Sequence, residues 1–197
     1  MVTDSHPHPR VVADPAPSGR LLRPVVLVGL MGAGKTAVGR RLAAALGVAF
    51  ADADEAIIEA AGMSIPDIFE VYGEAEFRDL ERRVVIRLLD EAKGVLALGG
   101  GAFVDPLTRA AVAERGISVW LKAELETLVA RVTRKRAVRP LLMQGEPRAI
   151  LAGLMERRYP LYAEADFTVL TGDQPLDEVV DRLTALLRRE GLIRDAA

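Results

Sequence analysis

The sequence contains no cysteine, few aromatic residues and almost no net charge. Without cysteine the chain forms no disulfide, carries out no thiol chemistry and binds no zinc through thiolates. Lys and Arg number 26 and Asp and Glu 28, so the net charge of −2 offers no electrostatic footprint for nucleic acid or an anionic membrane. We therefore expect neither as a partner, and any cationic site must be local.

Long apolar runs are also missing. No run reaches the roughly 18 residues that a membrane span needs, and the N-terminal region lacks the apolar segment of a secretory signal. Residues 1–22 are rich in proline and have almost no periodic apolar pattern, which predicts a disordered tail. We interpret His6 and His8 in this tail as solvated rather than as a metal pair. We expect a soluble cytoplasmic protein.

A phosphate-loop pattern occupies residues 29–36, which read Gly-Leu-Met-Gly-Ala-Gly-Lys-Thr. Residues 24–28 are apolar and β-branched, as in a buried strand, and Val38, Leu42 and Leu46 follow at helical spacing. The loop is therefore expected between a strand and a helix. Backbone N–H groups at a helix N-terminus attract anions, so this context predicts a nucleotide phosphate site.

Each residue of the loop has an expected role. We expect the backbone of Gly32, Ala33, Gly34 and Ala37 to surround the phosphates. Lys35 is expected to reach the β- and γ-phosphates of ATP, and the Thr36 hydroxyl is expected to bind Mg2+.

Strand and helix patterns alternate along the rest of the chain. Further strands are predicted at residues 48–51, 95–98, 117–121 and 167–170, and helices at 55–61, 64–72, 74–90, 106–115, 124–133, 148–158 and 176–189. This alternation predicts an α/β fold, a three-layer α/β/α domain over residues 23–192 with a central five-stranded parallel sheet. At 197 residues, one domain is the default.

Two aspartates follow the second predicted strand. Asp52 and Asp54 are two residues apart, so on an extended chain both side chains point to the same side. In one interpretation Asp52 helps to hold Mg2+ and Asp54 orients a substrate hydroxyl for in-line attack. In the other, Asp54 is only a helix N-cap and Asp52 is solvated. The neighbouring phosphate loop favours the first.

Three arginines are candidates for binding an anionic substrate. Arg78 lies between Glu74 and Glu81 at helical spacing, which a surface ion-pair ladder would also explain. Arg158 precedes a Tyr-Pro pair, and Arg139 lies in a basic stretch, residues 133–146, that we expect to be a mobile lid. Taken singly, each arginine has an ordinary structural explanation. Their order around the loop and the aspartates favours function.

With these motifs together, the chain resembles the shikimate kinases, a nucleoside-monophosphate-kinase-like branch of the P-loop kinases. The resemblance extends from about residue 24 to 189. It rests on residues 29–36, Asp-Ala-Asp at 52–54, Ile-Phe at 68–69, Gly-Glu-Ala-Glu-Phe-Arg at 73–78 with Glu81, Leu-Gly-Gly-Gly-Ala at 98–102, Arg-Pro-Leu-Leu at 139–142 and Arg-Arg-Tyr-Pro-Leu-Tyr at 157–162.

The resemblance implies ATP- and Mg2+-dependent phosphorylation of the 3-hydroxyl of shikimate, a step of aromatic amino acid biosynthesis. By the family pattern Arg78 and Arg158 hold the substrate carboxylate. Arg78 belongs to the substrate-binding helices expected at about residues 54–80. Gly100 and Gly101 let the backbone approach the substrate closely. Asp54 binds hydroxyls and is the candidate base.

The nucleotide side follows from the same resemblance. Lys35 and Arg139 are expected to stabilise the transferring phosphoryl group, with Arg139 delivered by the lid. Arg131 and Pro175 are assigned near the adenine. We expect a monomer whose partners are ATP or ADP and shikimate.

The chain departs from the family pattern at two positions. Ala53 stands where the family often has a hydroxyl residue, and Thr36 replaces the commoner serine. Two other hypotheses remain: a kinase for another small acceptor, such as gluconate or a nucleoside monophosphate, and a nucleotide-binding module without catalysis. Asp54, Arg78 and Arg158 distinguish them, because a binding module needs none of the three.

Overall fold

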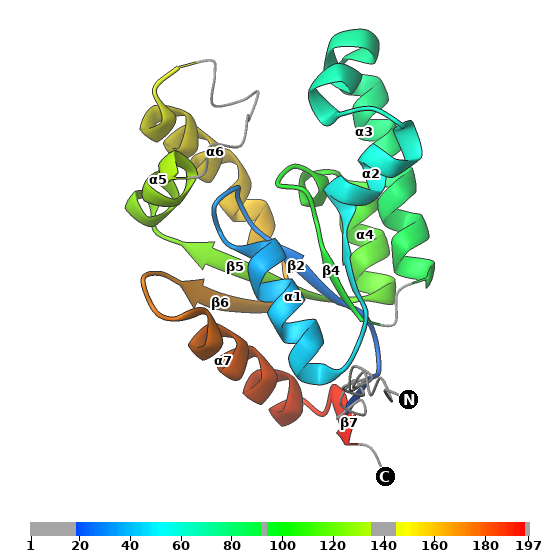
Figure 1. Cartoon of the computed structure of the whole chain (residues 1–197), viewed down its shortest axis with the longest axis vertical. Coiled ribbons are helices and arrows are strands. Elements are labelled where there is room, and N and C mark those ends of the chain that lie inside the picture. Colours follow the sequence, from blue (N-terminus) through cyan, green and yellow to red (C-terminus); the bar gives the residue numbers. More distant parts are fainter. Residues whose placement is uncertain (1–18, 92–93, 135–144, 196–197) are drawn as a thin grey trace, which may run out of the picture.

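The computed structural model describes residues 19–91, 94–134 and 145–195. A five-stranded parallel sheet with strand order β3-β4-β2-β5-β6 forms its centre (Figure 1). The strands are β2 (Val25–Val28), β3 (Phe50–Asp52), β4 (Val95–Ala97), β5 (Ile117–Ala123) and β6 (Phe167–Thr171). The predicted five-stranded parallel sheet is confirmed.

Helices cover both faces of this sheet. They are α1 (Lys35–Leu46), α2 (Ala53–Ala61), α3 (Ile65–Glu91), α4 (Pro106–Arg115), α5 (Leu125–Arg134), α6 (Pro147–Tyr162) and α7 (Leu176–Arg189), with a short 3-10 turn, η1 (Ala102–Val104). The pair α1 and α7 lies over one face, and α4 lies with α3 on the other (Figure 1). Among the described helices, none combines the length and apolar character needed to cross a membrane.

The strands are apolar because the sheet is covered on both sides. All four residues of β2 are buried, as expected for a central parallel strand. A second, smaller cluster of buried side chains joins α2 to α3 through Ile57, Ile68, Phe77 and Val84. The α2–α3 region therefore has a hydrophobic core of its own beside the main one.

Two features differ from the sequence predictions. The predicted tail extends to residue 22, but Gly19–Leu21 form β1 and pair antiparallel with β7 (Ile193–Asp195). The helix predicted at residues 148–158 was expected to end near Pro160, but α6 continues to Tyr162. Pro160 lacks a backbone N–H, so the helix loses one hydrogen bond there. Tyr162 is only 1% exposed, and its burial holds the last turn of α6 against the core.

Candidate active site

A cavity of about 900 Å³ opens beside the phosphate loop and the ends of β3, β4 and β6. Most predicted site residues line it: Gly32, Ala33, Gly34, Lys35, Thr36, Ala37, Asp52, Asp54, Arg78, Gly100, Gly101, Arg131 and Arg158. Arg139 falls outside the described residues. Pro175 does not line the cavity, but its neighbours Gln174 and Leu176 do. One hollow thus joins the phosphate loop to the predicted acceptor residues.

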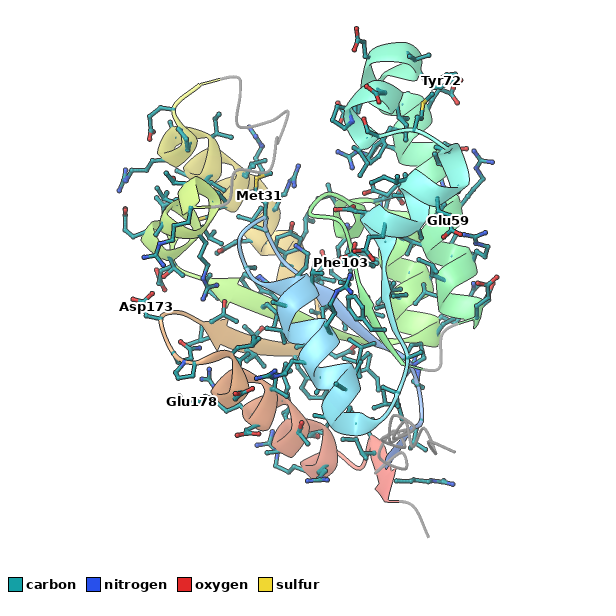
Figure 2. The ribbon with its side chains drawn as sticks, viewed as in Figure 1. Met31, Glu59, Tyr72, Phe103, Asp173 and Glu178 are labelled. Atoms are coloured by element: carbon teal, nitrogen blue, oxygen red, sulfur yellow. The ribbon has the colours of Figure 1, made fainter. Side chains whose placement is uncertain are left out.

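The phosphate loop connects β2 to α1, and Met31 lies at its tip (Figure 2). Gly32 and Gly34 have φ angles of 85° and 98°, a left-handed conformation that residues with a side chain rarely adopt. The Lys35 ammonium donates to the carbonyl oxygens of Gly29 at 2.8 Å and Leu30 at 3.1 Å. The loop is therefore curled, with the Lys35 side chain folded across it.

Asp52 joins the phosphate-loop helix to α2. Its Oδ2 accepts a hydrogen bond from the Thr36 hydroxyl at 2.8 Å, and its Oδ1 accepts from the backbone N–H of Asp54 at 3.0 Å. Asp52 is thus the N-cap of α2, and Asp54 lies in the first helical turn. The argument that both side chains share one face of an extended chain was wrong, because the helix begins between them. Both nevertheless line the same cavity.

The two helices joined by the smaller cluster carry two predicted acceptor residues. Asp54 lies in the first turn of α2, and Arg78 lies in α3 next to the buried Phe77. Gly73, with φ 82° and ψ 175°, interrupts α3 where a break was predicted. Packing between these helices therefore sets how Asp54 and Arg78 face the cavity.

Arg78 is held on several sides. Its guanidinium donates to Glu81 at 2.7 Å and to Glu74 at 3.3 Å, and it lies over the ring of Phe77 at 5.1 Å. Burial by itself lowers the pKa of Arg78, but the two carboxylates outweigh it and the net shift is upward, so Arg78 stays a cation. Both expected ion pairs are present, but Glu81 is buried, so they do not form a surface ladder, and Arg78 also lines the cavity. The structural and functional interpretations of Arg78 are therefore compatible.

Glu81 is the carboxylate at the base of this group. Its residue is 3% exposed, and burial raises its pKa against the opposing effect of Arg78. Asp54 and Arg158 also affect the pKa of Glu81, Asp54 raising it and Arg158 lowering it. The sequence, through the spacing of three residues, predicted Glu81 only as an ion-pair partner of Arg78, and did not predict its burial beside the predicted acceptor residues.

The three glycines at residues 99–101 make room for different groups. A Cβ at Gly99 would lie 2.5 Å from Oδ1 of Asp54, and a Cβ at Gly101 would lie 2.5 Å from Nη1 of Arg78. At Gly100 the nearest atom would be the backbone N of Met31 at 3.6 Å, an ordinary contact. Gly99 and Gly101 therefore accommodate the protein's own acceptor residues. Gly99 was not among the predicted site residues.

The carbonyl oxygen of Gly100 accepts two side-chain hydrogen bonds. Arg158 Nη1 donates at 2.7 Å and the Tyr162 hydroxyl donates at 2.5 Å. Both residues lie in the last turns of α6. The anchor on the Gly100 carbonyl holds Arg158 at the cavity, which both residues line.

The nucleotide side of the cavity is formed around Arg131. This residue donates to the carbonyls of Gly32 at 3.2 Å and of Gly172, so it links the phosphate loop to the segment after β6. Thr171 and Gln174 also line this part, and sequence reasoning did not select them. No motif spacing marks them: the Thr171 hydroxyl meets the carbonyl of Ala33 at 3.3 Å only once the chain is folded.

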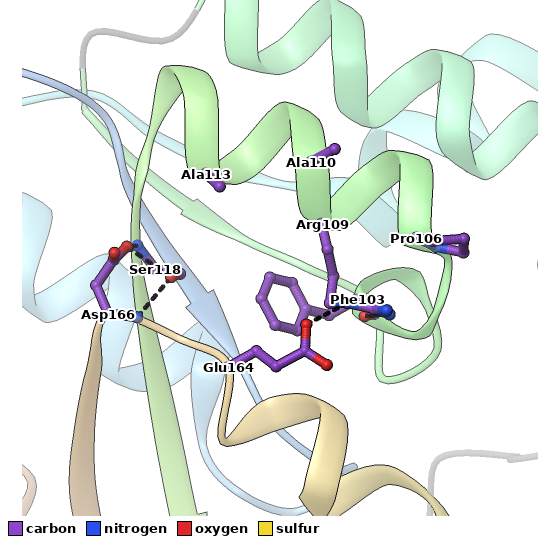
Figure 3. A pocket seen from close by; sticks show the side chains of 8 residues that line it. All are labelled: Phe103, Pro106, Arg109, Ala110, Ala113, Ser118, Glu164 and Asp166. Carbon is purple, nitrogen blue, oxygen red and sulfur yellow. Dashed lines mark hydrogen bonds and ion pairs between the residues drawn. The ribbon is translucent and has the colours of Figure 1, made fainter.

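A second cavity, of about 270 Å³, lies apart from the phosphate loop, next to α4 (Figure 3). Arg109 donates to Glu164 at 2.9 Å and to the carbonyl of Val104 at 2.8 Å, while the Ser118 hydroxyl donates to Asp166 at 2.7 Å. The polar side chains that line this second cavity are thus already hydrogen-bonded to other groups of the protein. This cavity offers no counterpart of the phosphate loop.

The fold and the cavity define a P-loop kinase for a small anionic acceptor. The defining features are the parallel α/β sheet, the phosphate loop, and a predicted acceptor region with one carboxylate and two arginines. A family model described as shikimate kinase matches residues 31–188. Shikimate kinases of Paramagnetospirillum magneticum and Mesorhizobium japonicum are 55% and 50% identical over 179 and 181 residues, each aligned over 91% of this chain and 89% of the relative. This chain belongs to the shikimate kinase family.

A solved structure supports the same assignment. The structure titled shikimate kinase from Acinetobacter baumannii in complex with shikimate has a TM-score of 0.82 and 39% identity, covering 87% of this chain and 96% of that one. The expected fold and family resemblance are therefore confirmed, and the chain is an ATP-dependent kinase of this family.

Proposed function

We propose that this chain transfers the γ-phosphoryl group of ATP to the 3-hydroxyl of shikimate, releasing ADP. The observation that carries the proposal is the single cavity of about 900 Å³ lined by Lys35, Thr36, Asp54, Arg78 and Arg158. Donor and acceptor groups thus share one space, which phosphoryl transfer without a covalent enzyme intermediate requires. The family relatives carry the same activity in their names.

The donor half binds the phosphates of ATP. The backbone N–H groups of residues 32–37 at the start of α1 favour negative charge through hydrogen bonding and the helix dipole. Lys35, now bonded to the carbonyls of Gly29 and Leu30, is expected to exchange these partners for the β- and γ-phosphate oxygens. A cation at this position disperses the charge that develops during transfer.

The residues present fit Mg2+. The Thr36 hydroxyl directs its hydrogen at Asp52, which leaves its oxygen lone pairs for a metal, and the carboxylate of Asp52 lies beside it. In the described residues no group of three or more His, Cys, Asp or Glu side chains is placed to hold a metal. Mg2+ does not require such a group, because phosphates and waters supply most of its ligands. When bound, the ion would neutralise phosphate charge. We assign Thr36 directly, and Asp52 through water, to it.

The acceptor half matches a small hydroxylated acid. Arg78 and Arg158 both line the cavity, and guanidinium groups bind carboxylates through paired, charge-assisted hydrogen bonds. Asp54 supplies the hydroxyl acceptor. We propose that it orients the 3-hydroxyl toward the γ-phosphate and receives its proton as the oxygen–phosphorus bond forms.

Four earlier expectations remain proposals. Arg139 lies outside the described residues, and we retain its role in stabilising the transferring phosphoryl group. Pro175, beside the cavity-lining Gln174 and Leu176, is retained as an adenine neighbour together with Arg131. We also retain the monomer and the cytoplasmic location.

The direct test is ADP release by purified protein with Mg-ATP across candidate acceptors. We expect turnover with shikimate and none with gluconate or nucleoside monophosphates. Turnover with one of those acceptors, and none with shikimate, would show that the acceptor is misassigned. ATP binding with no turnover on any acceptor would favour a binding module.

The division of roles is tested with two variants. Asp54→Asn should abolish turnover and leave ATP affinity nearly unchanged, because Asp54 belongs to the acceptor half. Lys35→Met should weaken both ATP binding and turnover. Equal loss of ATP binding in the two variants would contradict this division.

A further inference from the structure

Residues 99–101 form a wall of the acceptor site but have no side chains with which to fix their own shape. Glycine accesses more backbone conformations than any other residue, so three in succession leave the segment flexible unless other residues hold it. The site nevertheless needs one shape here, because Gly99 and Gly101 lie against Asp54 and Arg78. Local turns hold the carbonyls of Gly99 and Gly101 through the N–H groups of Ala102 and Val104, whereas the bonds to the carbonyl of Gly100 come from elsewhere in the fold.

Two helices supply further hydrogen bonds. On one side, Tyr162 and Arg158 of α6 both donate to the carbonyl of Gly100. On the other, Arg109 of α4 donates to the carbonyls of Phe103 at 3.1 Å and Val104 at 2.8 Å, just after the glycines (Figure 3). The glycine segment is thereby held at its centre from α6 and at its exit from α4.

Tyr162 is the most constrained of these donors. It is 1% exposed, and its ring lies 6.1 Å from that of Trp120, 6.2 Å from that of Tyr159 and 6.4 Å from that of Phe103. Burial raises the pKa of its hydroxyl to about 12 against the opposing effect of the neighbouring Arg158 guanidinium, so the group remains a donor at any physiological pH. Rotation of the Gly100 carbonyl away from this fixed donor would leave a buried hydroxyl unsatisfied, which is costly.

We propose that Tyr162 is a positioning residue for the acceptor: its hydroxyl fixes the Gly100 carbonyl, and that carbonyl in turn orients Arg158 toward the shikimate carboxylate. The inference rests on the proposed function of this cavity. Tyr162 does not line the cavity itself, whereas Gly100 and Arg158 do. Its effect on the reaction is therefore indirect and limited to the acceptor half.

The test is Tyr162→Phe, which removes the hydroxyl and keeps the ring in the core. The Gly100 carbonyl retains its bond from Arg158, so no buried acceptor is left without a partner. We expect the KM for shikimate to rise roughly 3- to 10-fold, as for loss of one hydrogen bond, with the KM for ATP and the melting temperature nearly unchanged. Shikimate affinity measured by calorimetry should fall by the same factor.

Tyr159→Phe is the matched control. Tyr159 lies one turn earlier in α6, and its hydroxyl also donates to a backbone carbonyl, that of Ala123 at 2.6 Å, outside the glycine segment. This variant should leave the KM for shikimate unchanged. An unchanged KM for shikimate in Tyr162→Phe, equal rises in both KM values, or the same rise in Tyr159→Phe would each overturn the proposal.

This experiment also separates the inference from the function on which it rests. If the unmodified chain shows no shikimate-dependent ADP release, the proposed function fails and the inference fails with it. If the unmodified chain is active and the Tyr162→Phe variant has the same KM for shikimate as the unmodified chain, only the positioning role is refuted.

Discussion

Gly99→Ala perturbs the acceptor site with a single added methyl group. Gly99 is buried and does not have a positive φ angle, so alanine fits its backbone conformation. The added Cβ would nevertheless lie 2.5 Å from Oδ1 of Asp54 and 3.0 Å from Oε1 of Glu81. The substitution therefore acts on these two carboxylates rather than through backbone strain.

The geometry gives the size of the effect. Ordinary carbon–oxygen contact needs roughly 3.4 Å or more, so the Asp54 carboxylate must retreat by about 1 Å. Misplacement of a reacting group by that much lowers a rate by about 100-fold, or about 2.7 kcal/mol in activation free energy. The packing cost to stability is about 1–3 kcal/mol, partly offset because alanine restricts the unfolded chain.

The assay is steady-state ADP release with shikimate varied at saturating Mg-ATP, together with thermal unfolding and ATP affinity. We expect kcat to fall about 100-fold and ATP affinity to stay near that of the unmodified chain, because the atoms nearest the added Cβ belong to Asp54 and Glu81 rather than to the phosphate loop. Gly153→Ala is the matched control. It adds a methyl to α6 with no heavy atom within 4 Å, so kcat should not change and stability should rise by about 0.5–1 kcal/mol.

An unchanged kcat in a folded Gly99→Ala protein would refute the reasoning, because Asp54 would then tolerate displacement and would not be the group that orients the acceptor. A parallel loss of ATP affinity would also contradict it, since the damage would extend beyond the acceptor half.

Two further predictions concern the pH dependence of stability. The buried Tyr162 holds its proton to about pH 12 when folded but to about pH 10 when unfolded, so its stabilising contribution is complete below pH 10 and is lost as the pH rises toward 12. In urea titrations the stability of the unmodified chain relative to Tyr162→Phe should fall by about 1.4 kcal/mol between pH 8 and 11; a constant difference would contradict the assignment. Asp105 caps α4 by accepting from the N–H groups of Leu107 at 2.7 Å and Thr108 at 3.1 Å; despite the opposing effect of burial, these bonds and Arg82 lower its pKa. Asp105→Ala should therefore lower the free energy of unfolding by about 1–2 kcal/mol at pH 7. This difference is present above pH 4 and is lost as the pH falls through the lowered pKa of Asp105. Asp105→Asn should retain most of the cap at pH 7, and equal losses of stability in the two variants would argue against capping.

The sequence by itself located the phosphate loop. The loop is formed by eight successive residues, so its position, its strand and its helix could all be predicted from local pattern. The sheet followed for a similar reason, because strands buried on both faces are continuously apolar. The three-residue strands β1 and β7 could not be predicted, since segments this short show no periodicity and pair across the whole chain.

The acceptor half depended on a resemblance of motifs, because Asp54, Arg78 and Arg158 are far apart in the chain and each has an ordinary local explanation. Only the tertiary structure decided how they are supported. It showed that Asp52 links Thr36 to α2, that Gly99 and Gly101 make room for Asp54 and Arg78, and that Tyr162 and Arg158 share one carbonyl. These contacts join residues from separate helices and loops, and no spacing along the sequence encodes a distance between side chains that meet only when the chain folds.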